Sequence, residues 1–223
     1  MKALHYIQYF LFLAINWNPR IAAYIVYHEV KGEKKYGIQT TGINELKSVK
    51  AAGIDITHAT IYMPVIYPLI EEAFEHLPAK RNHFLDMGCG KGRVLCVAAD
   101  KGFRRVTGID FSKPLCFDAE DNMQIALNKN KLVSFEVIND DVRNYTIPND
   151  VDCIFFFNPF DETIMKVVLK NILLSLKENE RKLTIIYANP LHKELFTNAG
   201  FIETFYRKKL TYLELSVLEN RSI

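Results

Sequence analysis

The sequence has few of the features that mark a metal site, a disulfide framework or a nucleic-acid-binding surface. Its four cysteines form no C-x-x-C pair and have no histidine nearby at metal-ligand spacing. We therefore expect no metal site, no disulfides and a reducing compartment. The net charge is only +2 and the basic runs are short, so nucleic acid is not an expected partner. The sequence also contains no internal repeat and no low-complexity segment.

The sequence also lacks an apolar run that could span a membrane, although it has an uncharged, aromatic-rich stretch near its start. The stretch ALHYIQYFLFLAINW, from Ala3 to Trp17, is shorter than the roughly 20 apolar residues that a spanning helix needs. Gln8 interrupts it and no clean A-x-A site follows, which disfavours a signal peptide. We expect a helix that packs on the domain or on another subunit. The alternative is an interfacial membrane anchor.

The next part of the chain also predicts helices. Asn18-Pro19 is a typical helix start, with Asn as N-cap and Pro in the first turn, and we expect this helix to end near Gly32. A polar connector follows, and residues 64–77 have the apolar spacing of an amphipathic helix. We expect residues 1–58 to form an apolar helical extension with its connector, and residues 59–223 to form the main domain.

From His83 onward, short apolar strands alternate with helices. The expected strands cover residues 83–87, 104–110, 132–140, 151–159 and 181–190, and the expected helices cover 91–101, 112–129, 161–176 and 191–199. Such alternation predicts an α/β fold with a parallel sheet and helices on both faces. The last two apolar segments, 201–208 and 210–218, have no helix between them and predict an antiparallel hairpin.

Three glycines at every second position, in the stretch FLDMGCGKGR, follow the first of these strands. Ligands of such sheets bind at the carboxyl ends of the strands, and glycine lets the backbone approach a ligand closely. A dinucleotide site would have the spacing G-x-G-x-x-G, but Arg93 stands where its third glycine would be. Asp86, just before the glycines, would repel a diphosphate and attract a ligand with an ammonium or a sulfonium.

These residues resemble the first motif of the class I S-adenosylmethionine-dependent methyltransferases, (D/E)-x-G-x-G-x-G, which DMGCGKG matches at every fixed position. The resemblance implies a Rossmann-like sheet of seven strands, mostly parallel with an antiparallel last strand. It implies S-adenosylmethionine as cofactor and S-adenosylhomocysteine as product. The residues that it places around the amino-acid end of the cofactor are Asp86, Gly88, Cys89, Gly90 and Gly92.

Further cofactor contacts are implied where the next two strands end. The family places an acid on the ribose hydroxyls, here Asp110, and the following Phe111 would lie against the adenine. Asp141 and Val142 would read adenine N6 and N1. From the residues alone, a turn-capping role for Asp141 and a core position for Phe111 stay open.

A narrower similarity covers YMPVIYPLIEEAF, the glycine loop, FFFNPF and IIYANP. It is to small bacterial methyltransferases of largely undefined substrate and, more distantly, to lysine methyltransferases of mitochondrial inner-membrane proteins. These share a Y-x-P element, here Tyr62-Met63-Pro64, which would place Tyr62 over the methionine end of the cofactor. A proline that merely begins a helix is the alternative interpretation.

The acceptor side is predicted where the fourth and fifth strands end. Asn158, next to the methyl group, would accept hydrogen bonds from an amine and stabilise the charge that grows on nitrogen. Phe160 would wall the acceptor channel, and Tyr187 and Asn189 would line the same cleft. The nearest analogy is the N-P-P-(Y/F) element of amino-group methyltransferases, but the second proline is missing here. His192 is a candidate general base or a surface residue at a helix start.

Together these features predict a cytoplasmic methyltransferase, with membrane association as an alternative location. The expected acceptor is a protein lysine or another amine. The alternatives are O- or N-methylation of a lipophilic metabolite, an NAD-dependent oxidoreductase and a non-catalytic subunit that binds S-adenosylmethionine. The expected partners are the amine-bearing acceptor and, through the N-terminal helices, a membrane surface or another subunit.

Overall fold

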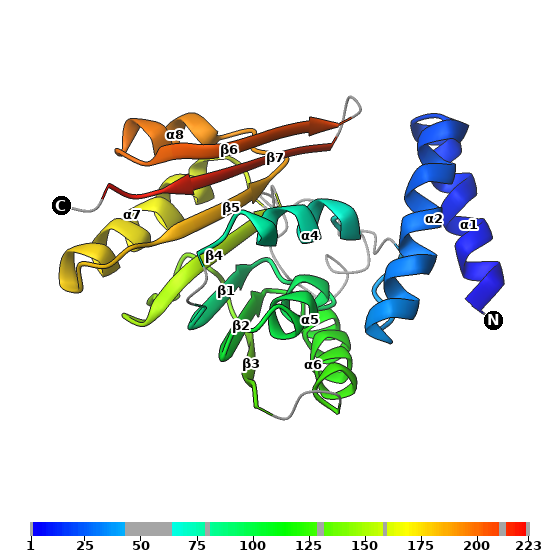
Figure 1. The fold of residues 1–223 in the computed structure, drawn as a ribbon, viewed down its shortest axis with the longest axis horizontal. Helices are drawn as coiled ribbons and strands as arrows, with labels where there is room; N and C mark the ends of the chain where they lie inside the picture. Colours follow the sequence, from blue (N-terminus) through cyan, green and yellow to red (C-terminus); the bar gives the residue numbers. More distant parts are fainter. Residues whose placement is uncertain are drawn as a thin grey trace.

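The computed structural model describes residues 2–42, 64–78, 81–128, 132–157, 160–209 and 213–221. Within them the chain forms a seven-stranded sheet of order β3-β2-β1-β4-β5-β7-β6 (Figure 1). The strands are β1 His83–Met87, β2 Arg105–Asp110, β3 Ser134–Asn139, β4 Val151–Phe157, β5 Thr184–Ala188, β6 Ile202–Lys209 and β7 Leu213–Glu219. β7 runs antiparallel to both β5 and β6, and the other pairs are parallel. The predicted Rossmann-like fold is confirmed.

Helices cover both faces of the sheet. The helices of the described residues are α1 Lys2–Asn16, α2 Pro19–Tyr36, α4 Tyr67–Glu75, α5 Arg93–Asp100, α6 Lys113–Leu127, α7 Glu162–Glu178 and α8 Lys193–Asn198. Apolar residues of α4, α5 and α6 form one buried cluster with one face of the strands, and those of α7 and α8 form a second cluster with the other face. Burial from both sides explains why β1 and β5 are buried along their whole length.

Two of the expected helix starts show how local sequence sets an element. Asp161 begins α7 as predicted, since its side chain accepts a hydrogen bond from the Ile164 N–H at 3.1 Å. Ser112 occupies the N-cap position of α6, but its side chain makes no capping bond. Instead its backbone N–H donates to Asp110 Oδ1 at 2.8 Å, so this helix start is tied to the end of β2.

α2 begins as predicted but ends later than expected. Asn18 Oδ1 accepts from the Ile21 N–H at 2.9 Å, and the helix continues past Gly32 to Tyr36. Gly32 lies within the helix, where its lack of a side chain lets the helix pack closely on Tyr67. A Cβ at this position would lie 2.1 Å from a ring carbon of Tyr67. The chain reverses instead at Gly37, whose φ of 78° is in the left-handed region that glycine adopts readily.

α1 and α2 stand side by side beyond one edge of the sheet (Figure 1). This is the carboxyl edge of the parallel strands, since residues of this helical pair and Phe157, the last residue of β4, line one cavity. Tyr9 and Leu13 of α1 and Ile25 of α2 are buried in the same apolar cluster as α4 to α6. The helical extension therefore shares a core with the domain that it precedes.

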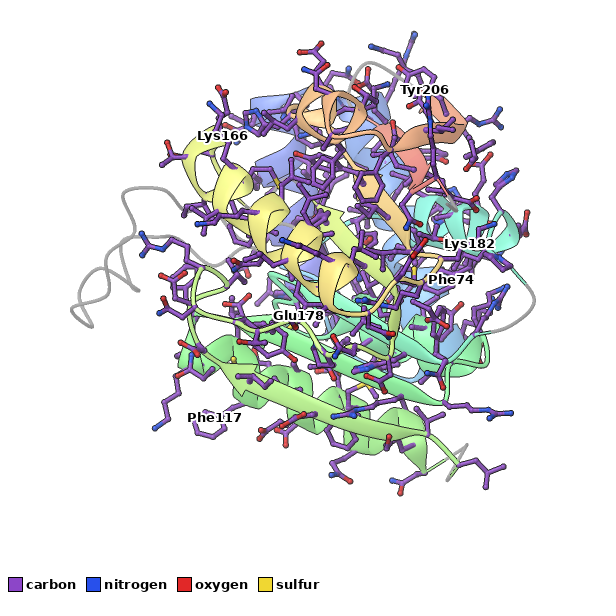
Figure 2. All side chains as sticks on the ribbon, turned by 90° about the vertical axis from the view of Figure 1, so that its left-hand side faces the viewer. Phe74, Phe117, Lys166, Glu178, Lys182 and Tyr206 are labelled. Carbon is purple, nitrogen blue, oxygen red and sulfur yellow. The ribbon has the colours of Figure 1, made fainter. Side chains whose placement is uncertain are left out.

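The outer face of α1 stays uncovered in the monomer. Its apolar residues Leu4, Ile7, Leu11, Phe12 and Ile15 are between 43% and 82% exposed. No helix of the described residues is long and apolar enough to cross a bilayer. Figure 2 looks at the molecule from the side away from α1 and α2, where the labelled Lys166 and Glu178 lie on α7.

Candidate functional site

The glycine loop adopts a backbone that only glycine enters without strain. Gly88, Gly90 and Gly92 have φ angles of 88°, 53° and 74°. At Gly92 a Cβ would also lie 3.1 Å from the backbone Cα of Ala119, so this glycine lets α5 and α6 approach closely. The N–H groups of Gly88 and Cys89 donate to the Ile109 carbonyl at 2.8 and 3.0 Å. The loop is thereby attached to the end of β2, at the carboxyl edge where strand order reverses between β1 and β4.

Asp110, at the end of β2, holds this loop by hydrogen bonds. Its Oδ2 accepts from the Gly90 N–H at 2.9 Å and its Oδ1 accepts from the Ser112 N–H at 2.8 Å. Burial raises the pKa of Asp110 to about 6, although these two N–H groups act in the opposite direction. Each carboxylate oxygen keeps a second lone pair with which it could accept a hydrogen bond from a ribose hydroxyl. The contact with the ribose itself stays a prediction.

Asp86 is the second buried acid of the loop. Its side chain is 2% exposed and receives no hydrogen bond from any residue in the described part of the chain. Burial, together with the nearby charge of Asp110, raises the pKa of the Asp86 carboxyl well above its usual range. A buried carboxylate without a donor is costly, and a positively charged ligand group would offset that cost. An unpartnered acid beside a bare backbone therefore fits the ammonium of S-adenosylmethionine.

Gly108 is a residue of the site that sequence reasoning missed. A Cβ on this β2 residue would lie 2.8 Å from Cys89 Sγ and 2.6 Å from a methyl group of Leu95. Its bare backbone therefore leaves the room in which Cys89, 6% exposed, packs beneath the loop. A glycine inside a strand marks such a close approach, so the signal was present in the sequence.

The residues predicted to hold the adenine lie at the ends of β2 and β3. Phe111 is half-buried, and Val142 is 6% exposed in the cluster under α7. Asp141 binds within its own loop: Oδ1 accepts from the Arg143 N–H at 2.9 Å and Oδ2 accepts from its Nε at 2.8 Å. These contacts are those of the turn-capping alternative, and adenine recognition by Asp141 and Val142 stays a prediction.

The described residues of the predicted acceptor side are more buried than a channel lining. Phe160 is 6% exposed and Tyr187 is 0% exposed, both within the α7–α8 cluster. Burial raises the pKa of Tyr187 to about 12, and its Oη accepts from the His192 N–H at 3.4 Å. Contact of either ring with an acceptor stays a prediction. Tyr62 and Asn158, to which the sequence gives the central roles, lie outside the described residues.

Asn189, at the end of β5, has a φ of 47°, an uncommon value for a residue with a side chain. Its N–H donates to the Glu214 carbonyl at 2.8 Å, which holds the start of β7 against this turn. Asparagine enters this left-handed region more readily than most residues with a side chain. A contact of Asn189 with the acceptor stays a prediction.

A buried ion pair behind the glycine loop was not foreseen at all. Arg93, the residue after the last glycine, is 2% exposed and makes a salt bridge with Glu29 of α2. Its Nη1 donates at 2.7 Å to Glu29 Oε1 and at 2.7 Å to the Val65 carbonyl, and its Nε donates at 2.8 Å to Thr40 Oγ1. The guanidinium carbon lies 4.3 Å from the centroid of the Tyr67 ring. Arg93 therefore links the loop to the helical extension.

A second glutamate of α2 completes this buried polar network. Glu33 Oε1 accepts from the N–H groups of Thr40 and Thr41 at 2.7 and 2.6 Å. The Thr41 hydroxyl donates to Glu29 Oε2 at 2.7 Å, and the Tyr6 hydroxyl of α1 donates to Glu33. α2 is thus held directly to Arg93, and α1 is held to α2 through Tyr6 and Glu33.

Comparison with known proteins is consistent with this geometry. Residues 84–179 match a family described as a methyltransferase domain. The chain is similar in structure to the PH0226 protein from Pyrococcus horikoshii OT3, with 19% identity and a TM-score of 0.53 over 69% of this chain and 89% of that one. It is also similar to the putative methyltransferase yhhF from Escherichia coli, with 15% identity and a TM-score of 0.53 over 72% of this chain and 92% of that one. No curated protein sequence matches the chain significantly.

A structure with the cofactor in place is also similar. It is magnesium protoporphyrin IX methyltransferase from Synechocystis PCC 6803 with bound S-adenosylmethionine, at 15% identity and a TM-score of 0.51, covering 69% of this chain and 79% of that one. The Rossmann-like sheet and the glycine loop place the chain among enzymes of the class I methyltransferase fold. The chain therefore carries a methyltransferase domain over residues 84–179, with the fold of enzymes that use S-adenosylmethionine.

The described residues contain neither a metal site nor a disulfide bond. Among the described residues, no group of three or more His, Cys, Asp or Glu side chains is arranged to hold a metal ion. The four cysteines are buried and free. Burial raises the pKa of Cys89 well above its usual range, so its thiol packs as a small apolar group.

Proposed function

We propose that the enzyme transfers the methyl group to an amine, either a protein lysine or the amine of another acceptor. The observation that carries this proposal is the end of β4. This strand pairs with β1 in the register Asp86 to Phe155, so its last residue, Phe157, lies at the same edge of the sheet as the glycine loop. The Asn158-Pro159 pair follows Phe157 directly in the sequence and resembles the N-P-P-(Y/F) element of amino-group methyltransferases, of which it lacks the second proline.

The residues of this chain divide the work of binding. Asp86 would accept hydrogen bonds from the ammonium of the cofactor, and Asp110 would take the ribose hydroxyls on its remaining lone pairs. Phe111, Asp141 and Val142 would surround the adenine. The bound cofactor supplies an electrophilic methyl carbon on a sulfonium.

The protein must then align the acceptor and exclude water. The Asn158 side-chain oxygen would accept a hydrogen bond from the amine and direct its lone pair at the methyl carbon. A bound cofactor would supply the methyl group and would take the electron pair of the C–S bond on its sulfur, as S-adenosylhomocysteine. The acceptor would react as a neutral amine, and the methylated nitrogen would release one proton to solvent.

The lysine methyltransferases of mitochondrial inner-membrane proteins share the Y-x-P element and the apolar N-terminal segment. This similarity supports a protein lysine as the acceptor. The exposed apolar face of α1 supports a further proposal, that this helix contacts a membrane surface or a second subunit. A cytoplasmic location stays a prediction.

Labelling a cell lysate with tritiated S-adenosylmethionine and purified enzyme tests the acceptor class. We expect the label in protein, in a form stable to base, as methyl-amines are. Label only in lipid-soluble small molecules would favour the lipophilic-metabolite alternative. Label in RNA or DNA would contradict the proposal.

The variant Asn158→Ala tests the role of this side chain. We expect turnover to fall by about 10²-fold, as for other hydrogen-bonding groups that act in a transition state, while S-adenosylhomocysteine affinity stays nearly unchanged. Loss of cofactor binding in calorimetry would move Asn158 from the acceptor side to the cofactor.

A further inference from the structure

The outer face of α1 is an apolar stripe. Leu4, Leu11 and Ile15 are 61%, 52% and 82% exposed. They recur at i, i+7 and i+11, so they share one face of the helix. The buried Tyr9 and Leu13 are on the opposite face, which packs on the rest of the protein. The apolar stripe therefore points away from the domain and fits an apolar partner.

The outer face of α2 is basic. Arg20, Lys31 and Lys34 are exposed and recur at i, i+11 and i+14, so they also share one face of their helix. The two acids of α2, Glu29 and Glu33, are on the opposite face and are buried. The exposed charged side chains of α2 are therefore all positive, although the whole chain has a net charge of only +2.

The end of β6 adds a further positive charge beside this basic face. The Nζ of Lys209 lies 5.1 Å from the centroid of the Tyr24 ring of α2. Burial lowers the pKa of His28, also on α2, and the charges of Lys209 and Lys31 lower it further. Both lysines are thus close to the same part of α2, and the basic face continues onto the end of the sheet.

We propose that α1 and α2 bind the surface of an anionic lipid bilayer, with the apolar stripe among the lipid chains and the basic face at the headgroups. The inference deepens the proposed contact of α1 and commits it to one partner. Helices that lie in a membrane interface combine an apolar face with lysines and arginines. Tyrosine is enriched at headgroup level, and Tyr27, 63% exposed, is on the same face of α2 as Lys31 and Lys34.

The charge of this surface disfavours a second copy of the chain as its partner. A two-fold dimer brings the same surface of both copies together, so the basic faces would approach each other. Neither α1 nor α2 has an exposed acid that could pair with these cations. An anionic bilayer supplies the opposite charge over its whole surface. Because the two helices stand at the carboxyl edge of the sheet, the proposed acceptor side would then face the lipid (Figure 1).

Co-sedimentation of the full chain with lipid vesicles tests the proposal. The two probes are vesicles of phosphatidylcholine alone and vesicles of an equimolar mixture of phosphatidylcholine and phosphatidylglycerol. We expect binding to the anionic vesicles that weakens as salt is added, and much weaker binding to the neutral ones. Lys31→Gln/Lys34→Gln should weaken anionic binding about 25-fold, roughly fivefold for each lysine. Ile15→Gln should weaken it about tenfold, because an apolar side chain is lost from the lipid.

Matched controls are found on α7, on the side of the molecule away from the two helices (Figure 2). Lys170→Gln/Lys177→Gln removes two exposed lysines, and Leu174→Gln removes a leucine that is 48% exposed. The controls should bind vesicles like the wild type. All the substituted side chains are partly or fully exposed, so each variant should unfold at the wild-type temperature, which verifies folding.

Three results would overturn the proposal. One is absent binding, or equal binding to neutral and anionic vesicles. Another is a loss of binding in the α7 controls as large as that in Lys31→Gln/Lys34→Gln. The third is a dimer that forms without lipid in analytical ultracentrifugation and that Ile15→Gln dissociates, since it would assign this surface to a second copy.

Membrane binding and the proposed methyl transfer can fail separately, because vesicle binding is measured without an acceptor. Binding to anionic vesicles by a protein that methylates no amine would support the membrane surface and overturn N-methyl transfer. Methylation of an amine by a protein that binds neither kind of vesicle would support N-methyl transfer and overturn the membrane surface.

Discussion

Two pairs of buried acids lie near the glycine loop and differ in whether the protein supplies their counter-charge. Glu29 and Glu33 of α2 receive hydrogen bonds from threonines and a tyrosine, and Glu29 pairs with Arg93. Asp86 and Asp110 have no cation beside them among the described residues, and Asp86 has no hydrogen-bond donor there. The first pair is complete within the protein, whereas the second is incomplete without a ligand.

This difference indicates a structural role for Glu29 and Glu33 and a ligand-binding role for Asp86 and Asp110. A buried charge that is fully paired holds two segments in one arrangement, here the helical extension and the start of α5. A buried charge without a partner lowers the stability of the unliganded protein and favours a cationic ligand. Burial and residue type alone would not distinguish the two pairs, since all four carboxylates are at most 8% exposed.

Arg93→Met should give the largest effect. It leaves Glu29 buried without its cation, and loss of one partner of a buried ion pair costs about 3–5 kcal/mol. We expect the free energy of unfolding in urea to fall by this amount. The double variant Glu29→Leu/Arg93→Met is the control and should lose less than Arg93→Met alone. A fall below about 1 kcal/mol in the single variant would mean that the pair does not hold the extension.

The stability of the unliganded protein should depend on pH through the titration of Asp110, one acid of the pair that lacks a counter-charge. The pKa of Asp110 in the folded protein is raised from 3.8 to about 6, chiefly by burial. The folded state therefore binds this proton more tightly than the unfolded state does. Its stabilising contribution is complete below about pH 3.8 and is lost as the pH rises through about 6.

Asp110→Asn removes this titration and isolates it from other groups. Between about pH 4 and 6, the free energy of unfolding of the unliganded wild type should fall relative to that of Asp110→Asn, by at most about 3 kcal/mol. Urea unfolding at several pH values measures the difference. Parallel curves for the two proteins would show that Asp110 titrates normally.

Asp86→Asn should separate binding from stability. We expect S-adenosylmethionine affinity to fall by about 1–3 kcal/mol, the range for a lost hydrogen bond to a charged group. Stability without ligand should be unchanged or higher, because a buried carboxylate becomes a neutral amide of similar shape. Calorimetry and thermal unfolding of the same samples give both numbers. Lower stability with intact affinity would reverse our assignment of the two pairs.

Tyr24→Phe should change stability the least of these variants. It tests whether every buried polar group without a hydrogen-bond partner binds a ligand. The Tyr24 hydroxyl oxygen is completely buried and has no hydrogen-bond partner in the described part of the chain. Its ring lies 5.1 Å from Lys209 Nζ, away from the glycine loop. Loss of the hydroxyl should leave cofactor affinity unchanged and raise stability by up to about 1 kcal/mol. A stability loss in thermal unfolding would reveal an unseen role for it.

Much of the binding loop could be predicted because its signals are local. The alternation of strands and helices predicted the sheet, and the spacing of glycines after β1 predicted a bare loop whose positive φ angles the structure shows. Asp86 and Asp110 were predicted because each lies at or near the carboxyl end of a strand. The acceptor side was less predictable: Phe160 and Tyr187 also lie near the carboxyl ends of β4 and β5, yet both side chains are buried in the core.

The sequence by itself determined the order of elements, the Rossmann-like class of the sheet and the chemistry of its glycine loop, because hydrophobic period, caps and glycine spacing act over a few residues. Only the tertiary structure decided that Gly32 continues a helix against Tyr67, that β7 lies between β5 and β6, and that Arg93 pairs with Glu29. These contacts join residues far apart in the chain. Their partners are chosen by packing and by the need to satisfy buried charge, which no local pattern encodes.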